Sequence, residues 1–193
     1  MGRDIKNLKI YLLDRNPEMY AAWNKHFYGK NNVSIVCSDF VEFMRRNKVD
    51  CVVSPANAFG IMDGGYDEAI TAWFGNDLQE RVQRYIVENL YGEQPVGSSI
   101  IIDTALNDIK LIHTPTMRTP SIIKDESLVY HCTRSSLIAA LNGGVNSVVV
   151  PAFGAATGCV PYDTVALMMW RAYEQLSNPP HKIDWKYAES QSF

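Results

Sequence analysis

The chain has 193 residues, of which 47% are hydrophobic and 20% charged, a composition typical of one soluble globular domain. Its net charge of −3 excludes a general electrostatic attraction to nucleic acid or to an anionic membrane surface. The four cysteines form no Cys-x-x-Cys pair, and with four scattered histidines they predict free thiols and no metal site.

The chain shows no targeting signal. The residues after Met1 lack the apolar core of a signal peptide, and no apolar run approaches the roughly 20 residues that span a bilayer. We therefore expect a cytoplasmic or nuclear protein without a membrane partner.

Short apolar strands alternate with helical patterns along the chain. Strands are predicted at 8–13, 33–37, 49–54, 98–103, 109–114 and 147–151, and helices at 18–28, 41–47, 67–73, 78–90, 126–141 and 161–176. This alternation predicts a layered α/β fold, and the short connection 104–108 predicts one antiparallel hairpin in a mixed sheet. Residues 177–193 are polar and are expected to form a C-terminal tail that packs through Ile183 and Trp185.

Two loops rich in small residues, 55–66 and 152–160, each follow an apolar strand and precede a helix. In open α/β sheets, ligands bind outside the carboxyl ends of the strands, where glycine backbone and helix N-termini hold phosphate groups. Tight turns alone would also require such glycines. The first strand is followed by Asp14-Arg15-Asn16-Pro17 and neither loop carries Gly-Lys-Ser/Thr, so the dinucleotide fingerprint and the P-loop are absent.

The residues around these loops resemble the macro domain family. Asp50 to Asn57 resembles the family's D-x-I-V-N-A-A-N strand, and Asp63 to Ile70 resembles the helix start V-D-x-A-I. Further matches are Ser38 to Phe40 with G-D-I, Leu111 to His113 with V-I-H, and Val148 to Pro161 with F-P-A-I-S-T-G-x-Y-G-Y-P. The resemblance covers about residues 33–176, and residues 8–28 look like an added strand–helix unit.

The resemblance implies a single domain over residues 1–193, a three-layer α/β/α sandwich with a mixed, mostly parallel central sheet. It also implies a cleft for ADP-ribose or an ADP-ribosylated substrate, with no cofactor. Asp39 would accept a hydrogen bond from the adenine amino group, and Asn57 would bind the distal ribose. The full ligand-binding set that it implies is Asp39, Phe40, Ala56, Asn57, Gly64, Gly65, Tyr66, Phe153, Gly154, Ala155, Ala156, Thr157, Gly158 and Cys159.

Within that set, backbone amides would hold the phosphates. The resemblance assigns the amides of Gly64, Gly65 and Tyr66 to the distal ribose and the nearby phosphate. It assigns the amides of residues 155–158 to the diphosphate.

Asp67 matches the aspartate that orients a water or the ribose in the hydrolase members of the family. The resemblance therefore implies hydrolysis of an ADP-ribosyl adduct or an ADP-ribose derivative, with Asn57 and Asp63 as further catalytic candidates. The chain departs from the family pattern at Ser54, Pro55 and Asp63. An aspartate at a helix start also commonly caps the helix, and both roles can coexist.

Two other functions stay open from the sequence. One is a non-catalytic module that binds ADP-ribose or a related nucleotide, and the other is a structural or assembly protein that kept the fold and lost the ligand. Arg118 follows a predicted strand and could reach a phosphate, although an ordinary surface position is favoured. Cys159, just before a helix, is a weaker candidate nucleophile.

Overall fold

The computed structural model describes residues 3–106 and 108–191. Outside it lie both ends of the predicted domain, including the last two residues of the predicted tail, and Asn107 of the predicted connection. The elements in chain order are η1 (Ile5–Asn7), β1 (Lys9–Asp14), α1 (Pro17–Phe27), β2 (Val33–Cys37), α2 (Phe40–Arg46), β3 (Cys51–Ser54), α3 (Gly65–Phe74), α4 (Asp77–Leu90), β4 (Ile100–Asp103), β5 (Lys110–His113), α5 (Ser127–Asn142), β6 (Ser147–Pro151), α6 (Tyr162–Ser177) and α7 (Trp185–Ser190).

Within the described part of the chain, six strands form one sheet in the order β2-β1-β6-β3-β5-β4. Neighbouring strands are parallel except for β4, which runs antiparallel to β5 at the edge. The expected hairpin and the mixed, mostly parallel sheet are therefore confirmed. Strand β1 pairs with β2 on one side and β6 on the other, so residues 8–28 supply an interior strand rather than an addition to an edge.

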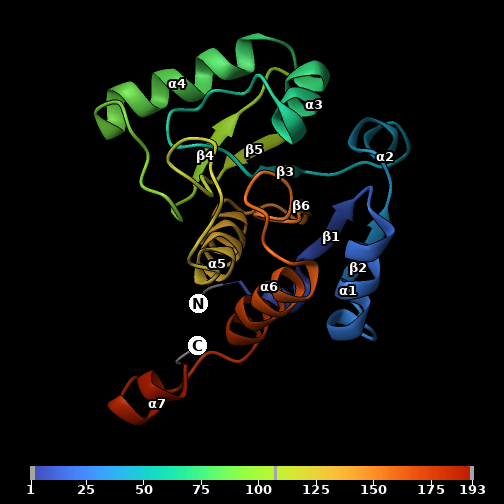
Figure 1. Ribbon diagram of the computed structural model, residues 1–193, viewed down its shortest axis with the longest axis vertical. Coiled ribbons are helices and arrows are strands. Elements are labelled where there is room, and N and C mark those ends of the chain that lie inside the picture. The colour runs from blue at the N-terminus through green and yellow to red at the C-terminus, as the bar shows by residue number, and fades with distance from the viewer. Residues whose placement is uncertain (1–2, 107, 192–193) are drawn as a thin grey trace.

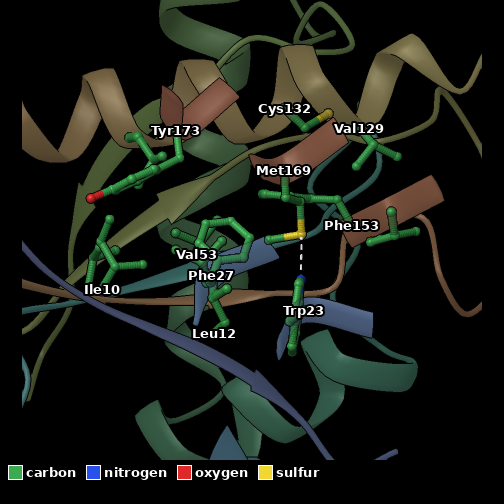
Figure 2. Close-up of a cluster of buried hydrophobic side chains, with 14 of the residues drawn as sticks. Ile10, Leu12, Trp23, Phe27, Val53, Val129, Cys132, Phe153, Met169 and Tyr173 are labelled. Atoms are coloured by element: carbon green, nitrogen blue, oxygen red, sulfur yellow. Dashed lines mark hydrogen bonds between the residues drawn. The ribbon is translucent and has the colours of Figure 1, made fainter. Parts of the chain in front are cut away.

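Helices cover both faces of the sheet, which gives the three-layer sandwich (Figure 1). One face packs against α1, α5 and α6 around Trp23, Phe153 and Met169 (Figure 2). The other face packs against α2, α3 and α4. Successive side chains of a strand point to opposite faces of the sheet. In β6, Val148 and Val150 accordingly pack on the face covered by α1, α5 and α6, and Val149 packs on the other face.

The parallel pairing decides where a site can form. Because β3 and β6 are neighbouring parallel strands, their carboxyl ends lie at the same edge of the sheet. The two loops rich in small residues leave the sheet from those ends. The loop from β3 enters α3, and the loop from β6 enters α6.

The C-terminal segment packs differently from the expectation. Ile183 and Trp185 are 78% and 82% exposed, so the predicted packing through them is wrong. The segment is held instead by Tyr187 and Gln191, which both accept hydrogen bonds from the Gln175 amide of α6. Tyr187 follows Trp185 by two residues, roughly 200° around the helix, so turning Tyr187 toward α6 leaves Trp185 on the opposite face.

Met169 tests the core under α6. Its side chain is fully buried, and its sulfur accepts the indole N–H of Trp23 at 3.3 Å (Figure 2). We expect Met169→Ala to lower the free energy of unfolding by about 3 kcal/mol, because it leaves a cavity and an unpaired indole. Val87→Ala on the exposed face of α4 should change it by less than about 0.5 kcal/mol. Equal losses in urea denaturation would contradict this account of the core.

Candidate functional site

The loop after β3 is shaped by the side chain of Asn57. Its carbonyl oxygen accepts hydrogen bonds from the amides of Phe59 at 3.1 Å and Ile61 at 3.3 Å, and its Nδ2 donates to the Ile61 carbonyl at 2.7 Å. Such local bonds to the backbone are typical of asparagine in turns. Because the amide group has two N–H donors and the loop uses one, Asn57 keeps one donor for a ligand.

The loop after β5 is attached to this loop. The amide of Ala58 lies 3.1 Å from the Met117 carbonyl and 3.2 Å from the Arg118 carbonyl. The Arg118 guanidinium binds the Glu93 carboxylate through two hydrogen bonds of 2.8 and 3.0 Å and lies over the ring of Phe59. Arg118 is thus engaged in joining surface segments, which does not favour the phosphate contact that its position allowed.

Asp67 is the third residue of α3 and is 7% exposed. Its Oδ1 accepts a hydrogen bond of 2.6 Å from the hydroxyl of Ser54, the fully buried last residue of β3. Burial raises the pKa of Asp67 from 3.8 to about 6, and the bond from Ser54 acts in the opposite direction. The group is therefore a buried carboxyl that titrates close to neutral pH.

No side chain of the described residues caps the start of α3. In the part of the chain that the structure describes, the amides of Gly64, Gly65 and Tyr66 donate to no protein acceptor. A methyl group added to Gly64 or Gly65 would meet no atom within 4 Å, so the space beside this backbone is open. These amides and the helix dipole favour an anionic group there. Asp63 is exposed just before them.

Tyr66 connects this helix start with the ends of β1 and β2. Its ring packs edge-on against Phe40 at 5.3 Å, and its hydroxyl is buried with no partner among the described residues. Burial, and then the nearby carboxylates of Asp14, Asp67 and Asp39, raise the pKa of Tyr66 well above its usual value. The four side chains therefore lie in one region at the carboxyl edge of the sheet.

The two other carboxylates of this region shape the backbone. Asp39 caps α2 and accepts hydrogen bonds from the amides of Val41 and Glu42 at 2.8 and 3.3 Å. Asp14 accepts the amide of Asn16 at 2.7 Å, and partial burial raises its pKa. Asp14 is not among the residues predicted for the site, although its position at the carboxyl end of a predicted strand is a usable signal.

The loop after β6 presents a second set of backbone donors. Among residues 152–161, the amides of Ala156, Thr157 and Gly158 donate to no described acceptor, whereas the Ala155 amide lies 3.3 Å from the Ala152 carbonyl. Gly158 is essential to this path, because a Cβ there would lie 2.6 Å from the Gly154 carbonyl oxygen. Three consecutive free amides are a feature of anion sites.

Apart from Asp67, Tyr66 and Ala155, which are described above, the predicted residues divide into two groups. The first group is exposed or half-buried around the carboxyl edge and consists of Asp39, Asn57, Asp63, Gly64, Gly65, Ala156, Thr157 and Cys159. The second group is buried in the packing beneath this edge and consists of Phe40, Ala56, Phe153, Gly154 and Gly158. Side chains of the second group position the loops, so any ligand contact from them comes through the backbone.

His113 lies beside Ser54 in the register of β3 and β5 and is fully buried. Its Nδ1 is 2.7 Å from Oε1 of Gln94, and the amide nitrogen of Gln94 donates to the His113 carbonyl. The ring proton is therefore on Nδ1, and Nε2 has no partner in the part of the chain that the structure describes. Burial lowers the pKa of His113 to about 3, so the ring is neutral near pH 7.

Burial also raises the pKa of Cys51 and Cys132 to about 12, which excludes these two thiols as thiolate nucleophiles.

Two cavities lie away from the two loops. One of about 390 Å³ lies among α5, α6 and α7, and one of about 450 Å³ lies between residues 97–99 and α5. No residue of either loop lines them. Within residues 3–106 and 108–191 there is no cluster of three or more potential metal ligands. No helix of this part is long and apolar enough to cross a membrane.

The sequence of this chain is similar to that of known proteins. Residues 53–169 match the family model described as Macro domain. An uncharacterized protein of Aquifex aeolicus is 33% identical over 121 residues, which cover 62% of this chain and 70% of that protein.

Two solved structures extend the comparison to the fold. The Oceanobacillus iheyensis macrodomain with ADP is 25% identical with a TM-score of 0.59, over 67% of this chain and 70% of that chain. The same macrodomain with MES bound has 19% identity and a TM-score of 0.62, and the match covers 92% of this chain and 82% of that one.

Asp67 gives the stability a specific pH dependence. An unfolded aspartate titrates near pH 3.9, so between about pH 4 and 6 the folded chain holds the extra proton and loses stability as the pH rises. Above pH 6 the full cost is about 3 kcal/mol. Asp67→Asn should therefore be more stable than the wild type at pH 7.5, with the difference vanishing near pH 4 in thermal denaturation. Glu68→Gln, an exposed neighbour, should show no such trend. Lower stability of Asp67→Asn at pH 7.5 would show that the carboxylate is favourably bound.

Proposed function

This chain belongs to the macro domain family, and from that premise we propose that it binds ADP-ribose and hydrolyses an ADP-ribosyl adduct or an ADP-ribose derivative. The observation that carries the proposal is Asp67, a buried carboxyl held by Ser54 directly beside the free amides at the start of α3.

Support for binding comes from the two sets of free backbone donors. The amides of Ala156, Thr157 and Gly158 suit a diphosphate, and those of Gly64, Gly65 and Tyr66 suit a distal ribose with its phosphate. The related Oceanobacillus iheyensis macrodomain has been solved with ADP, which carries the same diphosphate group. In this arrangement Asp39 lies at the adenine end and Asp67 at the distal ribose.

Support for hydrolysis comes from the state of Asp67. A carboxyl with a pKa of about 6 is mostly ionised at pH 7.5 and can still accept a proton. In the proposed reaction, a water oxygen bonds to the anomeric carbon of the distal ribose as the bond to the leaving group breaks. Asp67 orients that water and stabilises the positive charge that develops on the ribose. The proton from water passes by way of the carboxylate to the leaving group.

A non-catalytic binding module is the second candidate. The observation that favours it is the position of Asp67 in the first turn of α3, where a carboxylate is stabilised by the helix dipole without any reaction. Asn57 also uses both lone pairs of its carbonyl oxygen within its own loop, which leaves it one donor and no acceptor. This candidate predicts binding without turnover.

Asp67→Ala separates the two candidates. We expect release of ADP-ribose from an ADP-ribosylated protein to fall at least about 100-fold, because the group acts in the transition state. The dissociation constant for free ADP-ribose, measured by calorimetry, should change much less. Glu68→Ala removes an exposed carboxylate from the same helical turn and should leave both quantities near the wild-type values.

Each alternative has its own result. Wild-type binding with no release from any ADP-ribosylated substrate supports the binding module. Unchanged release by Asp67→Ala removes Asp67 from the mechanism. No heat at millimolar ADP-ribose contradicts both and supports a structural or assembly protein that kept the fold.

A further inference from the structure

Ser54 and Asp67 connect the sheet to helix α3 across the intervening loop. The two residues are 13 positions apart in sequence, and the hydrogen bond between them is buried. Ser54 ends a strand whose residues are all buried, so its hydroxyl is held in place by the sheet. Asp67 occupies the first turn of a helix whose start has no side-chain cap. The bond therefore fixes the carboxyl relative to the most rigid part of the fold.

The two oxygens of Asp67 have different surroundings. Oδ1 accepts the Ser54 hydroxyl. Oδ2 accepts no hydrogen bond from the described residues. It is also not fully buried, so it keeps contact with solvent. The Ser54 bond fixes the plane of the carboxyl, so one oxygen is held at the end of the strand while Oδ2 is the oxygen that meets water.

We propose that Ser54 is a positioning residue for the hydrolysis: its hydroxyl holds Oδ1 of Asp67 so that Oδ2 faces the attacking water. The same hydrogen bond favours the ionised form of the carboxyl. The inference rests on the proposed function for its catalytic consequence. The hydrogen bond itself does not depend on that function. At this position the chain has serine where the family pattern has asparagine.

The charged surroundings of Asp67 do not supply the stabilisation that Ser54 gives. Of the described residues, no Lys, Arg or His forms an ion pair with Asp67. His113, beside Ser54 on β5, is neutral near pH 7. The remaining titratable groups nearby are acidic or phenolic: Asp14, Asp39, Asp63, Tyr66 and Glu68. None of these favours a negative charge on Asp67, so the Ser54 hydroxyl is the side-chain contact that does.

Removing the hydroxyl should therefore move the titration of Asp67 upward. A hydrogen bond to a charged group typically corresponds to a shift of about one pH unit or more when it is lost. The wild-type turnover number should be half-maximal near pH 6 and rise above it. In Ser54→Ala the same inflection should lie about one pH unit higher. The loss of turnover relative to the wild type should therefore be roughly fivefold larger at pH 6 than at pH 8.

The matched control is Ser136→Ala. Ser136 is also a fully buried serine, and its hydroxyl donates to the Thr133 carbonyl within α5, on the other face of the sheet from α3. Its loss removes a buried hydroxyl and some stability without touching Asp67. Ser136→Ala should leave the inflection of the pH profile unchanged. Ser54→Cys keeps the shape of the side chain at a slightly larger volume and with a weaker donor. It should shift the inflection in the same direction as Ser54→Ala, which covers the case in which the alanine variant does not fold.

A titration of the aspartate side-chain carbons by NMR gives a readout independent of turnover, with the Asp67 signal assigned by its loss in Asp67→Asn. An upward shift in Ser54→Ala or Ser54→Cys, but not in Ser136→Ala, supports the positioning bond even if the protein proves to have no hydrolase activity. An unchanged Asp67 titration overturns the inference whether or not ADP-ribose is released. An altered titration with an unchanged pH profile of turnover would remove Ser54 from the reaction.

Discussion

The parallel pairing of β3 with β6 in the middle of the sheet is the constraint on which the rest of the structure depends. It brings the ends of two strands together, although their residues are about a hundred positions apart in the chain. The loop after β3 and the loop after β6 then lie at one edge, each followed by a helix whose first amides are not capped by a side chain. A surface rich in backbone N–H groups results without any lysine or arginine in either loop. This explains how a chain with a net charge of −3 can present a site suited to a diphosphate.

The same edge contains a conflict that the fold resolves locally. Burying a carboxyl disfavours its charged form, and the pKa of Asp67 rises accordingly. The hydroxyl of Ser54 and the start of α3 counteract this rise, so that the carboxyl titrates near neutral pH instead of staying protonated. A structural helix cap has no need of such burial, since exposed aspartates such as Asp39 cap helices in this chain. The cost in stability is what favours a functional role for Asp67.

Much of this architecture could be predicted from the sequence, because strands and helices follow hydrophobic periods that burial enforces. Strands β2 and β6 begin and end where their apolar runs do. Both loops could be located from residue types that tolerate close backbone approach, and Asp67 from its match to the aspartate of the macro domain pattern. It could not show that Ser54 bonds Asp67, because that contact depends on how α3 lies against the end of β3.

Other features escaped the sequence for related reasons. The interior position of β1 depends on pairing partners rather than on its own residues. The exposure of Ile183 and Trp185 follows from polar contacts of Tyr187 that a hydrophobic pattern does not show. The local bonds of Asn57 within its loop were likewise invisible in a motif, and they limit what its side chain can offer a ligand.

The central claim is that a ligand diphosphate binds the free amides of the β6–α6 loop while its distal ribose lies against Asp67. A crystal structure of the protein with ADP-ribose tests it most directly. The account predicts phosphate oxygens within hydrogen-bond distance of the Ala156, Thr157 and Gly158 amides, and the distal ribose beside Oδ2 of Asp67. ADP-ribose bound instead in the cavity among α5, α6 and α7, or with its distal ribose directed away from Asp67, would contradict it.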